Sequence, residues 1–575
     1  MNISLLYNVF LGETSPLIIA RVDSPAHEMG ARRMENMIPM LTGGMRKRPG
    51  TWFDGDTNNN NEARLIAWLL SDGSCVILEL TTGTIRVWRD QGKNTYQVIQ
   101  NITSPYTAGQ QYELHYAASA NQMWIVHQQQ RPVKLAWNGG SITLSYPTFT
   151  GKDFTAINER PSAVAFDSGR LCFAGTNNEP NRIYLSKAPD SINGVDRYTD
   201  FTAGSNPADA IVLEENDMHG SRIQWIAGNR QLLAATERAT WSDTGEIPTP
   251  ASFDMNIIEY AGANELQARG TREIMVYAGR DGKSLRALVW NQTQQGSGYI
   301  DMDISEQAAH LFTAGIKDFA VADYPYPMLW IVTQAGELVS CTINIRSGIL
   351  AYARHPTDGI VEAVAVAPQK TGDVIFLSVK RNEIRNIEHI ILEDLVNSDF
   401  TDSHYIDAGE SRTYGTPTKT ITGLQRFAGK RIYAFVDGAT EPPVIVNNEG
   451  TAEFQIAITK VHLGLPYKST FSPNTRQIPA NGTSVGKKRR IEKITLQLYR
   501  SIGGHAGTDE NKMTEIITKR FGEYKLGTAP EPFTGEYDMT VSGNIDTEGK
   551  LIISHDEPTP FTMLALVERV AILEA

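Results

Sequence analysis

Cysteine is scarce in this sequence of 575 residues, which holds only Cys75, Cys172 and Cys341. The odd count and the wide spacing fit neither a disulfide framework nor a zinc site. Each cysteine lies in an apolar run, such as "RLCFAG" around Cys172. We therefore expect reduced thiols within the core and synthesis in a reducing compartment.

Long apolar runs are also missing. None approaches the roughly 18 residues that a membrane-spanning helix needs. The first residues, "MNISLLYNVFLGE", lack the basic region of a signal peptide. These absences predict a soluble product of the cytoplasm that carries no targeting signal and has no membrane partner.

Positive charge is in deficit, because 53 Lys and Arg stand against 65 Asp and Glu and give a formal net charge of -12. Proteins that grip nucleic acid over their surface need clustered cations. The balance argues against that class. It is compatible with DNA that slides through a hole, since an acidic wall repels phosphates.

The motifs of common enzymes are absent from the sequence. It contains no HExxH, CxxC, GxSxG or P-loop pattern. "SDTG" at 242–245 resembles the Asp-box turn of sialidases, but Ile247 and Pro248 stand where the aromatic partner should follow. The box does not recur. We expect no enzyme activity and no cofactor, and keep a glycan-cleaving propeller as a minority hypothesis.

Two further stretches contain residues that could bind a metal. His404 lies near Asp402 and Asp407, although a solvated loop explains this grouping better. "DGDTNNNNE" (54–62) begins like an EF-hand loop, but it lacks the sixth-position glycine and carries Leu65 at the twelfth position. We expect a polar turn there and no metal.

What the sequence does have is a repeated pattern of short apolar runs and tight turns. "RLIAWLL-SDGS-CVILEL-TTG-TIRVWRD" (64–90) reads as three strands joined by Gly, Asn and Asp turns. Similar units begin near residues 64, 114, 161, 223, 272, 316 and 360. Most spacings lie between about 44 and 50 residues, the range of a four-stranded propeller blade. The pattern predicts an all-β chain with a β-propeller of about seven blade-like units, while a set of β-sandwiches is the alternative.

Composition changes near residue 395. All nine tryptophans lie at or before Trp330, and the later strand candidates lose the blade spacing. We therefore predict an N-terminal assembly segment (1–60), a propeller (61–395) and a β-sandwich-like platform domain (396–575). "PAHEMGARRMENMIPML" (25–41) is the best helical candidate of the N-terminal part, and 474–490 is expected to be a flexible loop.

The stretch "LTGGMRKRPGTWF" (41–53) has unusual local chemistry. Gly43-Gly44 on one side and Pro49-Gly50 on the other pin the backbone around Arg46, Lys47 and Arg48. Arg48 precedes a proline, which favours extended geometry, so its guanidinium should project from a fixed backbone. Guanidinium forks suit carboxylates and carbonyls. The stretch is interpreted as a clasp between elements or subunits.

A second basic group, Lys487, Lys488, Arg489 and Arg490, is the densest in the chain. It could contact DNA or an acidic partner. A solvated loop that leads into the strand "RIEKITLQL" is the favoured interpretation.

Several motifs, taken in order, resemble one protein family. "FLGETSPLIIARVD" resembles a Gly-Glu-x-Ser-Pro motif followed by Arg-x-Asp, and "MENMIPMLTGGMRKRPGTWF" resembles an Asn-x-x-Pro, Gly-Gly, Arg-Pro-Gly-Thr segment. "SGRLCFAGTNNEPNRIYLSKAPD", "GNRQLLAATERATWS", "ITGLQRFAGKRIYAFVDG", "VHLGLPY" and "GKKRRIEKITLQLYRS" continue the similarity. Together they resemble the tail nozzle proteins of short-tailed bacteriophages, also called tail tubular protein B. One departure is Phe427-Ala428, where the family has a more polar pair.

The resemblance implies a structural role without catalysis. It implies a hexameric ring at the distal end of a virion tail, below a head-tail adaptor, with a tail fibre or tailspike as a further partner. The ring would line the exit channel for double-stranded DNA, without binding it specifically, and hold the genome until ejection. Synthesis would take place in the host bacterial cytoplasm.

The candidate assembly residues follow from these motifs. They are Gly12, Glu13, Ser15, Pro16, Arg21, Asp23, Arg46, Lys47, Arg48, Pro49 and Gly50. We expect changing Arg46, Lys47 and Arg48 to alanine to weaken assembly while the fold stays intact. The competing functions are a propeller that binds or cleaves glycans and a general propeller scaffold for protein partners.

Overall fold

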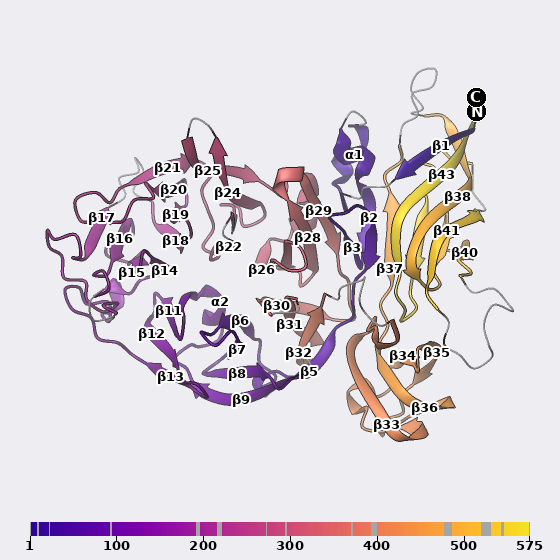
Figure 1. Cartoon of the computed structure of the whole chain (residues 1–575), viewed down its shortest axis with the longest axis horizontal. Coiled ribbons are helices and arrows are strands. Elements are labelled where there is room, and N and C mark those ends of the chain that lie inside the picture. Colours follow the sequence, from indigo (N-terminus) through magenta and orange to yellow (C-terminus); the bar gives the residue numbers. More distant parts are fainter. Residues whose placement is uncertain are drawn as a thin grey trace.

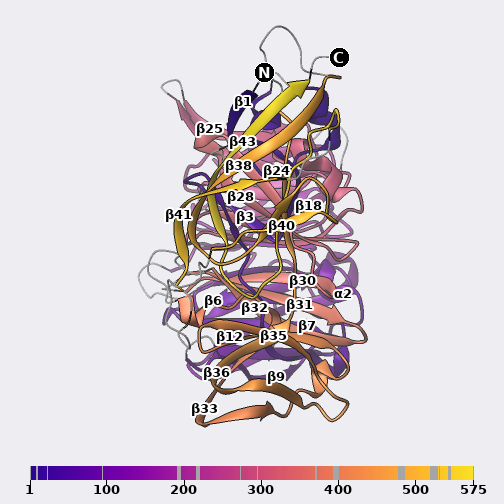
Figure 2. The same ribbon diagram turned by 90° about the vertical axis from the view of Figure 1, so that its right-hand side faces the viewer.

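The chain folds into a propeller with two further β units beside it (Figures 1 and 2). The computed structural model describes residues 2–7, 11–21, 24–92, 95–190, 196–214, 221–271, 273–293, 296–369, 372–392, 400–476, 486–518, 529, 531–541 and 545–573. The helices are all short: η1 (Pro16–Ala20), α1 (Pro25–Met29), η2 (Asn58–Asn60), α2 (Gln110–Glu113), η3 (Ile157–Glu159), η4 (Glu306–Phe312), η5 (Ile345–Ser347), η6 (Phe400–Asp402) and η7 (Gln425–Phe427). Among these described helices, none has the length and apolar character needed to cross a membrane.

The first four blades are separate antiparallel sheets in which each strand pairs with the next along the chain. Blade 1 contains β6 (Arg64–Leu69), β7 (Cys75–Thr81), β8 (Thr84–Asp90) and β9 (Tyr96–Thr103). Blade 2 contains β10 (His115–Ser119), β11 (Gln122–His127), β12 (Gln130–Trp137) and β13 (Ile142–Ser145). Blade 3 contains β14 (Ala163–Asp167), β15 (Arg170–Ala174), β16 (Arg182–Leu185) and β17 (Ile211–Glu214). Blade 4 contains β18 (Ile223–Gly228), β19 (Leu232–Thr236), β20 (Thr240–Asp243) and β21 (Met255–Glu259).

Three more blades complete the ring and confirm the prediction of about seven units. Blade 5 contains β22 (Arg269–Gly270), β23 (Ile274–Ala278), β24 (Leu285–Thr293) and β25 (Gly296–Asp303). Blade 6 contains β26 (Ile316–Ala322), β27 (Met328–Thr333), β28 (Leu338–Asn344) and β29 (Ile349–Arg354). Blade 7 contains β30 (Ile360–Ala367), β31 (Val374–Arg381), β32 (Ile384–Ile391) and β5 (Trp52–Asp56), which comes from the N-terminal part of the chain.

An apolar core lies between every pair of adjacent blades. Each blade packs both of its faces against its neighbours, so the second strand of a blade is apolar at most of its positions. β27 and β19, for example, are buried at every position. The core between blades 7 and 1 closes the ring, and there the rings of Tyr96 and Phe376 meet edge to face with centroids 4.6 Å apart.

The two remaining units lie on one side of the propeller (Figure 1). A lobe is built from β33 (Asp407–Ile421), β34 (Arg431–Val436), β35 (Ala439–Ile445) and β36 (Ala452–Leu465), and it has its own core. A sandwich packs one sheet, containing β1 (Asn2–Tyr7), β3 (Met37–Pro39), β4 (Met45–Lys47), β38 (Lys488–Ser501), β41 (Phe533–Thr540) and β43 (Thr562–Leu573), against a second. That second layer contains β2 (Ala31–Glu35), β37 (Ser469–Pro473), β39 (His505–Gly507), β40 (Met513–Glu515) and β42 (Ile552–His555).

The predicted boundaries need correction at both ends. Residues 1–60 do not form a unit of their own, because β1 to β4 belong to the sandwich and β5 to blade 7. Residues 396–575 form two units instead of one. The helix expected at 25–41 is confined to α1, and β2 and β3 follow it, because their apolar residues pack into the sandwich and against blade 6. Most of the loop expected at 474–490 lies outside the described residues.

The cysteines are free, as the sequence predicts, and burial raises the pKa of the thiols of Cys75 and Cys341 to about 12. Cys172 and Cys341 are buried, whereas Cys75 is partly exposed.

Replacing Phe376 with alanine should destabilise the protein by about 3–5 kcal/mol, because the lost ring leaves a cavity in the core that closes the propeller. Chemical denaturation followed by tryptophan fluorescence measures this. The control is Ile384→Ala in the same blade, where the side chain is 49% exposed and the change should stay within about 0.5 kcal/mol. Equal effects of the two changes would contradict the closure.

Candidate assembly site

Residues 11–21 and 24–56, which we call the strap, run past blade 6, through the sandwich and into blade 7. Its first contact is at Gly12, which forms a parallel bridge with Tyr352 of β29. Gly12 has a φ of +78°, and a Cβ there would lie 2.2 Å from the Tyr352 carbonyl oxygen. The site therefore needs glycine for both conformation and space.

Glu13 connects the strap to blade 6 and to the sandwich. Its side chain is 2% exposed, and Oε1 lies 2.9 Å from an Arg354 NH2 and 3.1 Å from His310 Nε2. The backbone N–H of Met34, in the sandwich strand β2, donates to Oε2 over 2.9 Å. A carboxylate without these donors would be costly to bury. Glu13 therefore acts as an intramolecular tie.

The next predicted residues form a turn against η4, which precedes blade 6. The Ser15 N–H donates to the Gln307 carbonyl over 2.7 Å, and its hydroxyl accepts from Leu17 at the start of η1. Pro16 occupies the first position of η1, where a missing N–H costs nothing. Arg21 is exposed and follows η1, while Asp23 lies outside the described residues.

The three basic residues of "MRKR" are buried, with Arg46 3%, Lys47 1% and Arg48 1% exposed. The expectation that alanine at all three leaves the fold intact is therefore wrong, because each change would empty a packed position and abandon its partners. The clasp that the sequence predicts is present, and in this chain it joins the chain's own parts.

Arg48 is the centre of that clasp. Its NH1 and NH2 groups lie 3.0 and 2.9 Å from the two carboxylate oxygens of Asp407, at the start of the lobe. Its Nε–H donates to Asn36 Oδ1 over 3.0 Å, and its guanidinium stacks on the Tyr467 ring at 4.3 Å. The Tyr467 hydroxyl donates to the Arg48 carbonyl. Each of the three guanidinium nitrogens of Arg48 thus has a hydrogen-bond acceptor, and these contacts offset the cost of removing the ion pair from water.

The network continues from Asp407 into blade 7. The hydroxyl of Thr357 donates to Asp407 Oδ2 over 2.7 Å and accepts from Arg381 NH1 over 2.9 Å. Arg381 also forms a bidentate pair with Glu388, whose Oε2 accepts from the Thr51 hydroxyl. Strap, lobe and propeller are therefore joined by one continuous set of buried hydrogen bonds.

Lys47 occupies a neighbouring buried site that faces the sandwich. Its Nζ lies 2.6 Å from the Glu557 carbonyl and 3.1 Å from Nδ1 of His555, and 4.7 Å from the centre of the Tyr467 ring. His555 Nε2 is 2.8 Å from the Ile502 carbonyl, so the imidazole carries its proton there and Nδ1 accepts. Burial lowers the pKa of the Lys47 ammonium to about 7.

Pro49 and Gly50 complete the clasp. The Gly50 N–H donates to the His404 carbonyl over 2.7 Å, and a Cβ at Gly50 would lie 2.0 Å from the Ile406 carbonyl oxygen. Only glycine allows the two backbones to approach this closely.

The sequence suggests that His404 lies in a solvated loop, and this prediction is wrong because the side chain is buried. It is 2% exposed and stacks on Trp52 with ring centroids 3.7 Å apart, because β5 brings Trp52 over it. Burial lowers the pKa of its imidazole to about 3. Asp407 pairs with Arg48, and Asp402 with Lys460. Within the described part of the chain, no group of three or more His, Cys, Asp or Glu is arranged to hold a metal.

The second basic group lies elsewhere. Its residues lead into β38, where Lys488 and Arg490 are exposed and Arg489 is buried, with NH1 donating to the Arg476 carbonyl. Lys487, just before the strand, is partly exposed. Arg490 pairs with Ala571 and Arg46 with Thr562, at opposite ends of β43. At strand geometry this separates the two groups by about 30 Å, so they form no common patch.

The axis of the propeller is crossed by polypeptide. Glu265 and Gln267, which precede β22 of blade 5, reach β10 of blade 2 on the far side. The Glu265 carbonyl lies 2.8 Å from His115 Nε2, and the Gln267 amide both donates to and accepts from the Tyr116 backbone. Among the described residues, cavities of about 130, 410 and 270 Å³ lie around this crossing.

Comparisons with known proteins extend only to the fold. No family model and no curated protein matches the chain. The WD40 domain of Neurospora crassa Pan2 is similar at a TM-score of 0.34 and 11% identity, over 58% of this chain and 91% of that one. A chain of a crystal structure of the mitotic checkpoint complex is similar at 0.35 and 9%, over 60% and 95%. The propeller assignment rests on the sheet topology of the chain itself.

Replacing Asp407 with alanine should cost about 3–5 kcal/mol of stability, because it leaves the Arg48 guanidinium buried without its carboxylate. Burial raises the pKa of the Asp407 carboxyl, but Arg48 outweighs it, so the pKa lies below its ordinary value. Since the folded pKa is depressed, this stability is present above the unfolded pKa and is lost as pH falls through the folded one.

Urea unfolding of the Asp407→Ala and Arg48→Met variants and of the double variant measures the pair. The summed losses of stability of the two single variants should greatly exceed the loss of the double variant, because each single change leaves a buried partner unpaired. The matched control is Arg32→Ala, which breaks an exposed pair with Glu548 and should cost at most about 1 kcal/mol. Additive effects at Arg48 and Asp407 would show that they do not interact.

Lys47 should make stability rise with pH. Its folded pKa of about 7 lies below the unfolded value of about 10.4, so the unfolded state binds more protons between these values. The free energy of unfolding should then rise by up to about 1.4 kcal/mol per pH unit in that window. Lys47→Met should remove this rise, measured by urea unfolding at several pH values. Parallel curves for the two proteins would contradict it.

Proposed function

We propose that this chain is a non-catalytic structural subunit of the tail of a short-tailed bacteriophage, assembling as the distal nozzle ring. In this proposal six copies attach below the head-tail adaptor, line the DNA exit channel, hold the genome until ejection and present a surface to a tail fibre or tailspike. DNA passes between the subunits without specific binding.

One observation carries the proposal: the family-like motifs of the sequence coincide with the strap. Gly12, Glu13 and the "MRKRPG" stretch are the residues that join blade 6, the sandwich, the lobe and blade 7 through buried contacts. A body whose parts are joined at several points resists relative motion. Such rigidity suits a load-bearing ring component better than an enzyme that opens and closes around a substrate.

Two other features support the same proposal. The axis of the propeller is crossed by residues 265–269, so a DNA channel has to lie between subunits. The net charge of -12 suits a wall along which phosphates slide. The competing glycan-cleaving hypothesis lacks the recurring Asp-box pattern in the sequence.

The purified protein, alone and mixed with its adaptor ring, should give six copies per assembly in native mass spectrometry. We expect no turnover and no saturable binding when a glycan panel is tested in parallel. A protein that stays monomeric, ignores the adaptor and binds a sugar would overturn the nozzle proposal in favour of the glycan-binding alternative.

A further inference from the structure

One of the cavities around the crossing, of about 270 Å³, is lined by the inner strands of five blades. Its wall consists mostly of small apolar residues, which are Ala67, Gly270, Ala320, Val321, Ala365 and Val366. Its polar lining residues are Tyr116 of β10, Gln267, and Arg269 of β22. A concave apolar wall with a few polar groups is the usual make-up of a small-molecule site.

Two guanidiniums lie near this cavity and share one carboxylate. Arg64 and Arg269 lie 5.9 and 5.8 Å from the centre of the Tyr116 ring. Arg269 pairs with Asp318, which is 3.2 Å away and has a side chain 4% exposed. In the described part of the chain, Arg64 donates only to backbone carbonyls, those of residues 111, 112 and 114. One buried carboxylate therefore faces two cations, and the group carries an excess positive charge.

The electrostatics of the group agree with that excess. Burial, and next to it the charge of Arg269, lowers the pKa of the Arg64 guanidinium. The imidazole of His115, beside the same two arginines, has its pKa lowered to about 4, mainly by burial. His115 is therefore neutral at pH 7 and adds no charge. A buried excess charge is costly unless an opposite charge compensates it.

Hydrogen-bond donors beside the cavity are also unused. Both contacts of Arg269, to Asp318 and to the Phe319 carbonyl, are made by NH1. Its Nε–H has no acceptor among the described residues. Gln267 holds the backbone N–H and carbonyl of Tyr116, but within the same described residues nothing bonds to the Tyr116 hydroxyl. Unused donors beside an excess positive charge indicate that the missing partner is an anion.

We propose that this cavity binds a small organic monocarboxylate, an anion with a compact apolar body. The carboxylate accepts hydrogen bonds from the Tyr116 hydroxyl and the Arg269 guanidinium, and it balances the excess charge. The apolar body packs against the alanine and valine wall. An inorganic anion would balance the charge but leave this wall in contact with water, so the organic anion is the better fit. The site lies apart from the strap and does not depend on the nozzle assignment.

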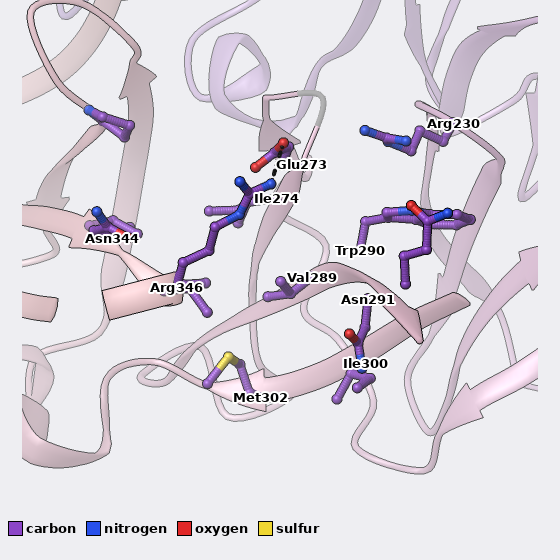
Figure 3. A pocket seen from close by; sticks show the side chains of 14 residues that line it. Arg230, Glu273, Ile274, Val289, Trp290, Asn291, Ile300, Met302, Asn344 and Arg346 are labelled. Carbon is purple, nitrogen blue, oxygen red and sulfur yellow. Dashed lines mark hydrogen bonds and ion pairs between the residues drawn. The ribbon is translucent and has the colours of Figure 1, made fainter. Parts of the chain in front are cut away.

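The larger cavity at blade 5, of about 750 Å³, differs in its charges (Figure 3). Its arginines, Arg230 and Arg346, are both exposed, and Arg346 pairs with Glu273 over 2.8 Å. Water screens such exposed charges, so they require no bound anion. Ile300 lines this second cavity and is 51% exposed, which makes it a suitable control position.

The test uses the full chain with benzoate as the probe, titrated by saturation-transfer difference NMR. Saturable binding is expected, with a dissociation constant below about 1 mM. Benzamide and benzylamine keep the ring but are neutral and cationic, and each should bind at least tenfold more weakly. Equimolar chloride should not displace benzoate, and its displacement would overturn the choice of an organic anion.

Two variants locate the binding. Tyr116→Phe removes only the hydroxyl and should weaken benzoate binding at least fivefold, whereas Ala67→Phe fills the cavity from β6 and should abolish it. Ala136→Phe is the matched control, because Ala136 is also half-buried but lies on β12 outside the cavity, and Ile300→Lys tests the cavity of Figure 3. Both controls should leave the affinity unchanged.

Four outcomes would each overturn the proposal. They are the absence of saturable binding, equal binding of benzoate and benzamide, an unchanged affinity in Tyr116→Phe, and equal effects of Ala67→Phe and Ala136→Phe. Because Tyr116→Phe keeps the ring and its packing, it decides the matter even where Ala67→Phe does not fold.

Discussion

The bidentate pair between Arg48 and Asp407 is the contact on which the arrangement of the three β units depends. Both side chains are 1% exposed, so neither can be left without the other. Arg48 belongs to the strap, Asp407 begins the lobe, and Thr357 and Arg381 extend the network into blade 7. Because Lys47 is held by the sandwich at the adjacent position, a single turn of chain fixes propeller, lobe and sandwich together.

Local features of the sequence were enough to predict the blades. Each blade is a run of neighbouring strands joined by short turns, and alternating apolar runs and turn residues are visible within about 50 residues. The long third unit is explained by the connection between Leu185 of β16 and Ile211 of β17. The strand that closes blade 7 could not be found in this way, because β5 pairs with β32 more than three hundred residues later.

The same distinction applies to the site. Glycines and the proline around "MRKR" indicated a fixed backbone with projecting cations, and a clasp is what the structure contains. The partner of Arg48 could not be identified, because one sequence gives no signal that pairs it with a residue 359 positions away. The burial of His404 and Asp407 could not be predicted for the same reason. Residues 31–39 form strands because tertiary packing outweighs their helical pattern.

The strap should make propeller, lobe and sandwich unfold as one cooperative body, and thermal unfolding followed by several probes measures this. Tryptophan fluorescence reports on the propeller, because all nine tryptophans lie in its blades. Amide exchange read by mass spectrometry reports on the lobe through β36 and on the sandwich through β43. We expect coincident transitions in the native protein, and separate ones after Asp407→Ala. A native protein whose sandwich or lobe melts well before the propeller would contradict it.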